Sequence, residues 1–64
     1  MTVKQILKIV TGVDEFHIET EDEFRFYLAS LVDNIIAEFG DREIVSISFY
    51  QDGCNDRVCN IEIK

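Results

Sequence analysis

The 64-residue chain contains no proline, three glycines, two cysteines and a single histidine. Two cysteines are too few for the disulfide framework of a small secreted protein, so the composition favours a reducing compartment such as the cytoplasm. Cys54 and Cys59 lack a second pair of ligands at zinc-site spacing, and His17 cannot complete a zinc site by itself. We therefore expect no metal and no cofactor.

Basic residues are also scarce. Thirteen acidic residues against six basic ones give a net charge of −7. A protein of this charge is poorly suited to hold nucleic-acid phosphates or anionic lipid through a basic surface. The chain also lacks both an apolar run of the roughly 18 residues that a membrane span needs and a signal-peptide core. We expect no direct contact with nucleic acid or membrane.

What is present is the composition of a folded protein, with 47% hydrophobic residues. We expect residues 1–64 to form a single domain. A chain of this size hides only about 60% of the surface of its unfolded state. Since neither disulfides nor a metal can supplement the core, burial against another copy is the remaining source of stability. The sequence therefore predicts a homo-oligomer, with a dimer favoured.

The first part of the chain predicts a helix followed by a strand. Thr2 and Gln5 have the spacing of a capping box, an apolar stripe of helical period follows, and Gly12 suits the position just past a helix end. Residues 15–20 then alternate between apolar and polar side chains, as in a half-buried strand.

Two interpretations exist for residues 21–39. One is a single helix with an apolar stripe, which leaves Phe26 on its polar side. The other is a strand over residues 24–28, joined to the previous strand by a tight turn at 21–23, and then a helix from Ser30 to Phe39. In that hairpin Phe16 faces Leu28 and Ile18 faces Phe26, so the apolar faces coincide. The aromatic density favours the hairpin.

The last part of the chain predicts a second hairpin, with Asp52-Gly53 in its turn. Its apolar face pairs Phe49 with Cys59, Ile47 with Ile61 and Val45 with Ile63. The predicted fold class is therefore α+β: a small antiparallel sheet of two hairpins, with three to four strands, packed with an N-terminal helix and a second helix that ends near Phe39.

Catalytic chemistry finds little support. A nucleophile needs a base within hydrogen-bond reach and a third group that orients it, and no such arrangement around His17 is recognisable. A Cys54–Cys59 redox pair is disfavoured, because Cys54 falls at the turn and Cys59 points inward from a strand, so that their Cβ vectors diverge. We expect a protein that is not an enzyme, with Cys59 as a small core residue.

Six acids lie within ten positions with no base among them. They are Asp14, Glu15, Glu19, Glu21, Asp22 and Glu23. One interpretation is an anionic patch that docks on the basic surface of another protein. The other is a solvated strand face and turn that keep the protein soluble.

The arginines offer a different site. Arg25, Arg42 and Arg57 could together clamp a phosphate or carboxylate, above all across an oligomer interface, with Tyr27 or Tyr50 stacking on a base. Local ion pairs with neighbouring acids are the alternative. The outer face of the last hairpin, which carries Ile44, Ser46, Ser48 and Tyr50 and is joined by Tyr27 in the hairpin interpretation, is either an interface or a surface that a helix covers.

Three segments carry a resemblance: Met1-Thr2-Val3-Lys4-Gln5-Ile6-Leu7, Asp41-Arg42-Glu43-Ile44-Val45 and Ile61-Glu62-Ile63. Together they resemble small uncharacterised accessory proteins of phages and prophages of gut and other Gram-positive bacteria. The resemblance implies a host-takeover or counter-defence product in the cytoplasm of a bacterial host cell.

Three hypotheses for function follow. The first is an anti-CRISPR-like inhibitor that occludes a basic host protein with residues 14–23. The second is an oligomeric sponge that sequesters a nucleotide-like immune signalling molecule. The third is a structural or assembly protein without a ligand.

Overall fold

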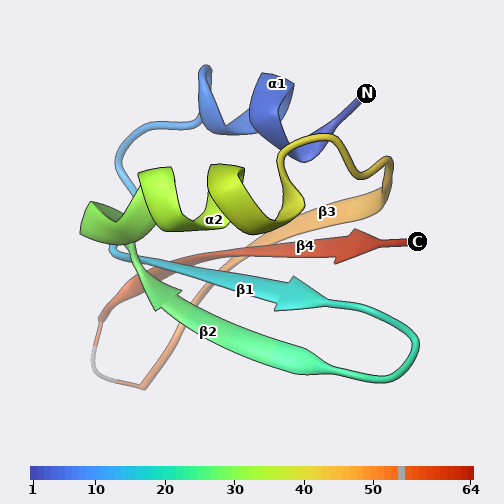
Figure 1. The fold of residues 1–64 in the computed structure, drawn as a ribbon. Helices are drawn as coiled ribbons and strands as arrows, with labels where there is room; N and C mark the ends of the chain where they lie inside the picture. The colour runs from blue at the N-terminus through green and yellow to red at the C-terminus, as the bar shows by residue number, and fades with distance from the viewer. Residues whose placement is uncertain (54) are drawn as a thin grey trace.

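The computed structural model describes residues 1–53 and 55–64. In these residues the chain forms, in order, α1 (Val3–Leu7), β1 (Glu15–Glu19), β2 (Phe24–Leu28), the 3-10 segment η1 (Ala29–Leu31), α2 (Val32–Phe39), β3 (Ile44–Gln51) and β4 (Arg57–Ile63). The strands form one sheet in the order β2-β1-β4-β3, and the helices lie together over one of its faces (Figure 1). The predicted α+β class is confirmed.

The predicted capping box begins α1. The Thr2 hydroxyl accepts the N–H of Gln5, and the Gln5 side chain accepts the N–H of Thr2 at 2.9 Å. The helix ends at Leu7, earlier than the sequence predicts, and Gly12 lies in the following loop, with a positive φ of 79°. Neither helix in the described part of the chain has the length and apolar composition that a membrane crossing requires.

The hairpin interpretation of residues 21–39 is confirmed, since β2 precedes a separate helix. Helix α2 ends at Phe39 and Gly40 is its C-cap, where a Cβ atom would lie 2.5 Å from the carbonyl oxygen of Ile36. Glycine is therefore needed here for close packing. Its backbone conformation does not require glycine, because a φ of −53° is ordinary for a helix.

The predicted register of the first hairpin is wrong by one residue. Phe16 lies opposite Tyr27 and Ile18 opposite Arg25, because Thr20 and Glu23 close a two-residue turn in place of the predicted three-residue turn. Since strand side chains alternate between faces, this single step turns over the whole of β2. Its three large apolar side chains point away from the helices. They are Phe24, Phe26 and Leu28, and each is more than half exposed.

The second hairpin matches its prediction except at one end. Phe49 pairs with Cys59 and Ile47 with Ile61, as expected. A register shift between Ile44 and Ser46 then places Ile44 opposite Ile63, so the predicted Val45–Ile63 pair is wrong. As a result Ile44 packs on the core from the helix side, and Val45 is 54% exposed.

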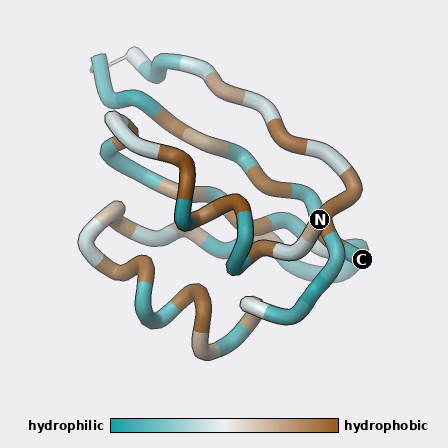
Figure 2. The backbone as a smooth tube through the Cα atoms, turned by 90° about the horizontal axis from the view of Figure 1, so that it is seen from above, coloured by the Kyte–Doolittle hydropathy of each residue, from teal (hydrophilic) through white to brown (hydrophobic). Residues whose placement is uncertain are grey.

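The two hairpins join through a parallel pair, β1 and β4, in which Phe16 lies beside Cys59 and Ile18 beside Ile61. The sheet is therefore mixed, and the prediction of a wholly antiparallel sheet is wrong for this pair. Viewed from the helix side, hydrophobic residues recur along the helices and the strands beneath them (Figure 2). The buried core between these layers consists of Val3, Ile6, Leu7, Phe16, Ile18, Ile35, Phe39, Cys59, Ile61 and Ile63.

Thr20 offers a test of the turn that sets the register of β2. Its hydroxyl accepts the N–H groups of Asp22 at 3.3 Å and Glu23 at 2.9 Å. Thr20→Ala should lower the free energy of unfolding, measured by urea denaturation, by about 1 kcal/mol, because these turn N–H groups lose their acceptor. Thr20→Ser keeps the hydroxyl, so its free energy of unfolding should fall much less. Equal losses in the two variants would contradict this role.

Candidate functional site

The sheet face that points away from the helices has no helix or strand over it in the described part of the chain, and we call it the open face. Its strand side chains, fixed by the three pairing registers, are Glu15, His17, Glu19, Phe24, Phe26, Leu28, Ser46, Ser48, Tyr50, Val58, Asn60 and Glu62.

Aromatic rings gather at the centre of the open face around His17. The His17 ring lies 5.1 Å from the Phe24 ring, 5.5 Å from Phe26 and 6.0 Å from Tyr50, measured between centroids. Phe24, Phe26 and Tyr50 are exposed for 59%, 55% and 47%. Large aromatic side chains with this exposure are typical of an interaction surface.

Both nitrogens of His17 have partners on the open face. The Tyr50 hydroxyl lies 2.9 Å from Nδ1, and the Glu15 carboxylate lies 3.4 Å from Nε2. The His17 side chain is only 13% exposed, although the face around it is uncovered. These contacts fix the ring, so that it holds Tyr50 of β3 in a defined position near the two phenylalanines of β2.

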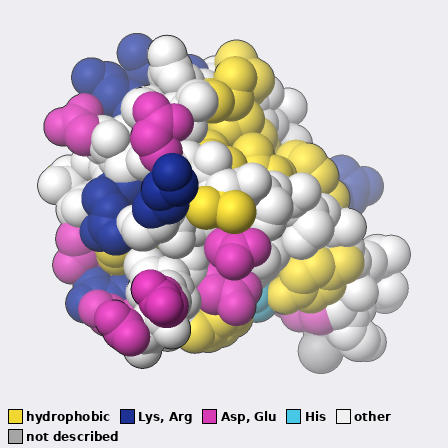
Figure 3. All heavy atoms as spheres, turned by 90° about the vertical axis from the view of Figure 1, so that its right-hand side faces the viewer, with side chains coloured by type: hydrophobic (Ala, Val, Ile, Leu, Met, Phe, Trp, Pro, Cys, Tyr) yellow, Lys and Arg dark blue, Asp and Glu magenta, His cyan; other side chains and the backbone are white. Residues whose placement is uncertain are grey.

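Charge differs between the two faces of the sheet. The open face carries Glu15, Glu19 and Glu62, and none of its described strand residues is a lysine or an arginine. The strand arginines, Arg25 and Arg57, alternate onto the helix side. On the neighbouring side of the molecule, where the chain ends lie, acidic and basic side chains are interspersed (Figure 3). The open face is thus aromatic at its centre and acidic toward its ends.

The structure divides the predicted acidic stretch into two groups. Asp14 and Glu15 lie at the start of β1, whereas Glu19 and the turn residues 21–23 lie at its end, about 15 Å away for a five-residue strand. The Asp14 carboxylate accepts the N–H of Arg57 at 2.9 Å, and Glu23 pairs with Arg25 at 2.8 Å. The six acids therefore do not form the single patch that the sequence predicts.

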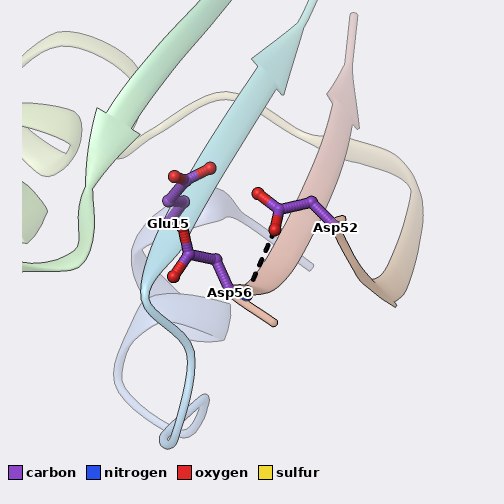
Figure 4. Close-up of side chains that lie close together, drawn as sticks. All are labelled: Glu15, Asp52 and Asp56. Atoms are coloured by element: carbon purple, nitrogen blue, oxygen red, sulfur yellow. Dashed lines mark hydrogen bonds between the residues drawn. The ribbon is translucent and has the colours of Figure 1, made fainter. Parts of the chain in front are cut away.

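Glu15 lies close to two acids that are distant in the sequence, Asp52 and Asp56 of the β3–β4 turn (Figure 4). One carboxylate oxygen from each lies within 4.8 Å of the others, and Asp52 also accepts the N–H of Asp56 at 3.1 Å. Oxygen ligands of this kind suit Ca²⁺ or Mg²⁺, but Ca²⁺ takes about six to eight of them. Partly exposed acidic clusters are common without an ion, so we assign no metal here.

Arg25 and Tyr27 join β2 to α2 through Glu38. Arg25 donates to Glu38 at 2.5 Å, and the Tyr27 hydroxyl donates to the same carboxylate at 2.7 Å. The hydrogen bond from Tyr27, and then the one from Arg25, hold the pKa of Glu38 below its ordinary value. The prediction that Tyr27 joins the outer face is therefore wrong, because it follows from the register error in β2.

Arg42 and Arg57 lie at opposite ends of β4. Arg42 donates through Nε to the main-chain oxygen of Lys64 at 2.9 Å, and Arg57 donates to the carbonyl of Gly12 at 3.4 Å. With Arg25 on β2, the three arginines occupy separate places in one chain. A clamp made from all three does not form within a single copy.

Arg57 borders a groove on the helix side of β3. The residues that line it are Thr11, Gly12, Val13, Phe49, Tyr50, Gln51, Arg57 and Val58. Phe49 lies on the predicted apolar face of the second hairpin, opposite Cys59, but it is 62% exposed because α1 ends at Leu7. Ile9, beyond that helix end, is likewise 67% exposed. No periodicity in the sequence signals where a short helix stops covering a strand.

Cys59 is a fully buried free thiol within the core, as predicted. Burial raises the pKa of this thiol to about 11, which keeps it protonated and unreactive at neutral pH. The predictions for Cys54 lie outside the described residues.

Comparisons with protein-family models, with curated proteins and with solved structures find no match to this chain. Function is therefore inferred from the geometry of the open face and the groove.

Replacing Glu38 by glutamine should make the free energy of unfolding depend less on pH in the acidic range. Because the folded-state pKa of Glu38 lies below its ordinary value of 4.5, the carboxylate stabilises the fold above that pH, and this contribution is lost as the pH falls through the folded-state pKa. E38Q should therefore lose less stability than the parent protein between about pH 6 and pH 3 in urea unfolding. Glu21→Gln, in the exposed turn, controls for the change of charge. If E38Q lost as much stability as the parent protein when the pH falls, this role of Glu38 would be contradicted.

Proposed function

We propose that this chain is a non-catalytic binding protein that covers a basic surface of another protein with its open face. The observation that carries the proposal is the exposed aromatic cluster around His17, flanked by Glu19 and Glu62 on a face whose described strand residues include no lysine or arginine. An exposed apolar centre with polar ends resembles the anatomy of a protein interface.

The chemistry of the open face favours an arginine-rich protein surface as its partner. A guanidinium can stack on the exposed rings of Phe24 or Phe26 and at the same time pair with a carboxylate at the end of the face. The same carboxylates repel nucleic-acid phosphates and anionic lipid headgroups. Protein binding therefore fits this face better than either polyanion.

Occlusion is the mechanism that this size and charge support. A small rigid sheet can block a surface on which a host protein handles nucleic acid, in the manner of an anti-CRISPR-like inhibitor made inside a bacterial host cell, as the resemblance to phage accessory proteins implies. A structural role without any ligand is the alternative in which the open face is covered permanently during assembly.

A pair of charge-reversal variants tests the proposal. After capture of a partner from host-cell extract, the purified partner is titrated with the parent protein, with Glu19→Lys/Glu62→Lys and with Asp33→Lys/Asp41→Lys. The first variant changes the open face, whereas the second makes the same change of net charge at exposed positions outside the sheet. We expect the open-face variant to bind about tenfold or more weakly, and the affinity of the parent to fall with salt.

The control variant should bind within about twofold of the parent. Equal affinities for all three proteins would contradict the proposal. Circular dichroism verifies that each variant is folded.

A second candidate function, the sequestration of a small anionic ligand, is favoured by the groove beside β3. Arg57 could supply the cation and the exposed Phe49 an aromatic surface for a planar base. Arg25 and Arg42 have hydrogen-bond partners elsewhere, and the hydroxyl of Tyr50 contacts His17. Of the predicted ligand-binding set, Arg57 is therefore the residue best placed for this role.

Native mass spectrometry of the protein purified gently from host cells tests the sequestration function. A retained ligand should appear as added mass in the parent and in Arg42→Ala, and should be lost in Arg57→Ala, because only Arg57 borders the groove. A spectrum without added mass in any of the three proteins argues against this function. Loss in Arg42→Ala but not in Arg57→Ala would place the ligand elsewhere.

A further inference from the structure

Strand β2 forms one edge of the sheet, with β1 on its inner side. The ladder between them is bracketed by two main-chain hydrogen bonds, from Thr20 N to Glu23 O at 2.8 Å and from Ala29 N to Asp14 O at 2.9 Å. Because hydrogen-bonded and non-hydrogen-bonded pairs alternate in an antiparallel ladder, the main-chain groups of Phe24 and Phe26 and the N–H of Leu28 point away from β1.

This edge lacks the usual protection against pairing. The described residues of β2 include no proline and no lysine, and its register with β1 has no bulge. Its single charge, Arg25, points to the helix side and is neutralised by Glu23 and Glu38. The opposite edge, β3, differs, because a register shift interrupts it near Ile44. An unprotected edge with exposed apolar side chains is a template for another strand.

We propose that a second copy of this chain occupies the edge, through antiparallel pairing of β2 with β2 about a two-fold axis at Phe26. Each Phe26 lies opposite its own counterpart, and Phe24 of each copy lies opposite Leu28 of the other. The two sheets then continue into one, and the exposed apolar side chains of both copies form a single row on the joined open face.

The proposed register follows from the side chains of β2. It pairs all five residues of the strand and sets Arg25 of each copy opposite Tyr27 of the other, where a guanidinium can stack on the ring. Moving the axis to residue 25 sets two arginines directly opposite each other, which is unfavourable. Moving it to residue 27 leaves Phe24 opposite Ser30, beyond the end of the strand.

The charges at the two ends of β2 also favour the antiparallel arrangement. It separates the acidic turns of the two copies (residues 21–23) and brings each turn beside residues 29–31 of the other copy. A parallel arrangement would bring the two acidic turns together. The dimer does not rest on the proposed binding function, although it would double the area of the open face.

Sedimentation equilibrium over a range of protein concentrations tests the dimer, with two matched variants. Phe26→Lys places two like charges at the proposed axis, whereas Phe49→Lys makes the same change at a similarly exposed phenylalanine on the other edge strand. We expect about twice the single-chain mass for the parent and for F49K, and at least about a tenfold weaker dimer for F26K. Circular dichroism verifies that both variants fold.

Disulfide trapping tests the register. In a Cys54→Ser background, Phe26→Cys should cross-link two chains on mild oxidation, because paired Cα atoms across a ladder lie about 5.5 Å apart, within disulfide range. Phe24→Cys should not, because its counterpart lies about four residues further along.

Three results would overturn the proposal. The parent protein could be a monomer at all concentrations, which would leave the edge to a strand of another protein. The F26K and F49K variants could dimerise equally well. F24C could cross-link as readily as F26C. Each of these results is independent of whether Glu19→Lys/Glu62→Lys loses its basic partner, so failure of the dimer and failure of the binding function can be told apart.

Discussion

The length of the turn between β1 and β2 determines which side chains of β2 are exposed to solvent. Thr20 accepts the N–H groups of Asp22 and Glu23, and the main-chain bond between Thr20 and Glu23 closes the hairpin with two residues between them. With one more residue in the turn, β2 would present Phe24, Phe26 and Leu28 to the core and Arg25 and Tyr27 to solvent. With the turn as it is, Arg25 and Tyr27 reach Glu38 and anchor α2, while the apolar side chains are left outside.

The helices could not cover those side chains in any case. In the described chain α1 has five residues and α2 has eight, and both lie on the same face of the sheet. A chain of 64 residues can build one well-buried layer between helices and sheet, and little beyond it. The second face must therefore be polar, or be covered by another molecule. Here it is polar toward its ends and aromatic at its centre, around His17.

Local patterns predicted most of the elements but not the relations between them. The capping box at Thr2, the alternation of residues 46–50 and the break at Gly40 depend on neighbouring residues, and each of these predictions agrees with the structure. The register of β2 depends on whether the turn before it has two or three residues, and the apolar periodicity carries no signal for this. The bulge near Ile44 depends on how the sheet meets the core, and it has no signal in the periodicity either. The parallel pairing of β1 with β4 depends on how the chain returns to the sheet after α2, and no local sequence pattern encodes this. The same pairing brings Glu15 close to Asp52 and Asp56.

The exposed apolar side chains of β2 take part in both proposed interactions. The core gains little from Phe24, Phe26 and Leu28, because each of these residues is more than half exposed. Polar strand-forming residues such as threonine would suit solvent better at these positions. Their side chains lie on the open face, while main-chain groups of the same residues form the free edge. A partner strand on that edge would order the row of rings without covering it, because strand pairing acts in the plane of the sheet and the rings project out of that plane. Dimer formation and the binding of a basic partner can therefore use the same residues without competing.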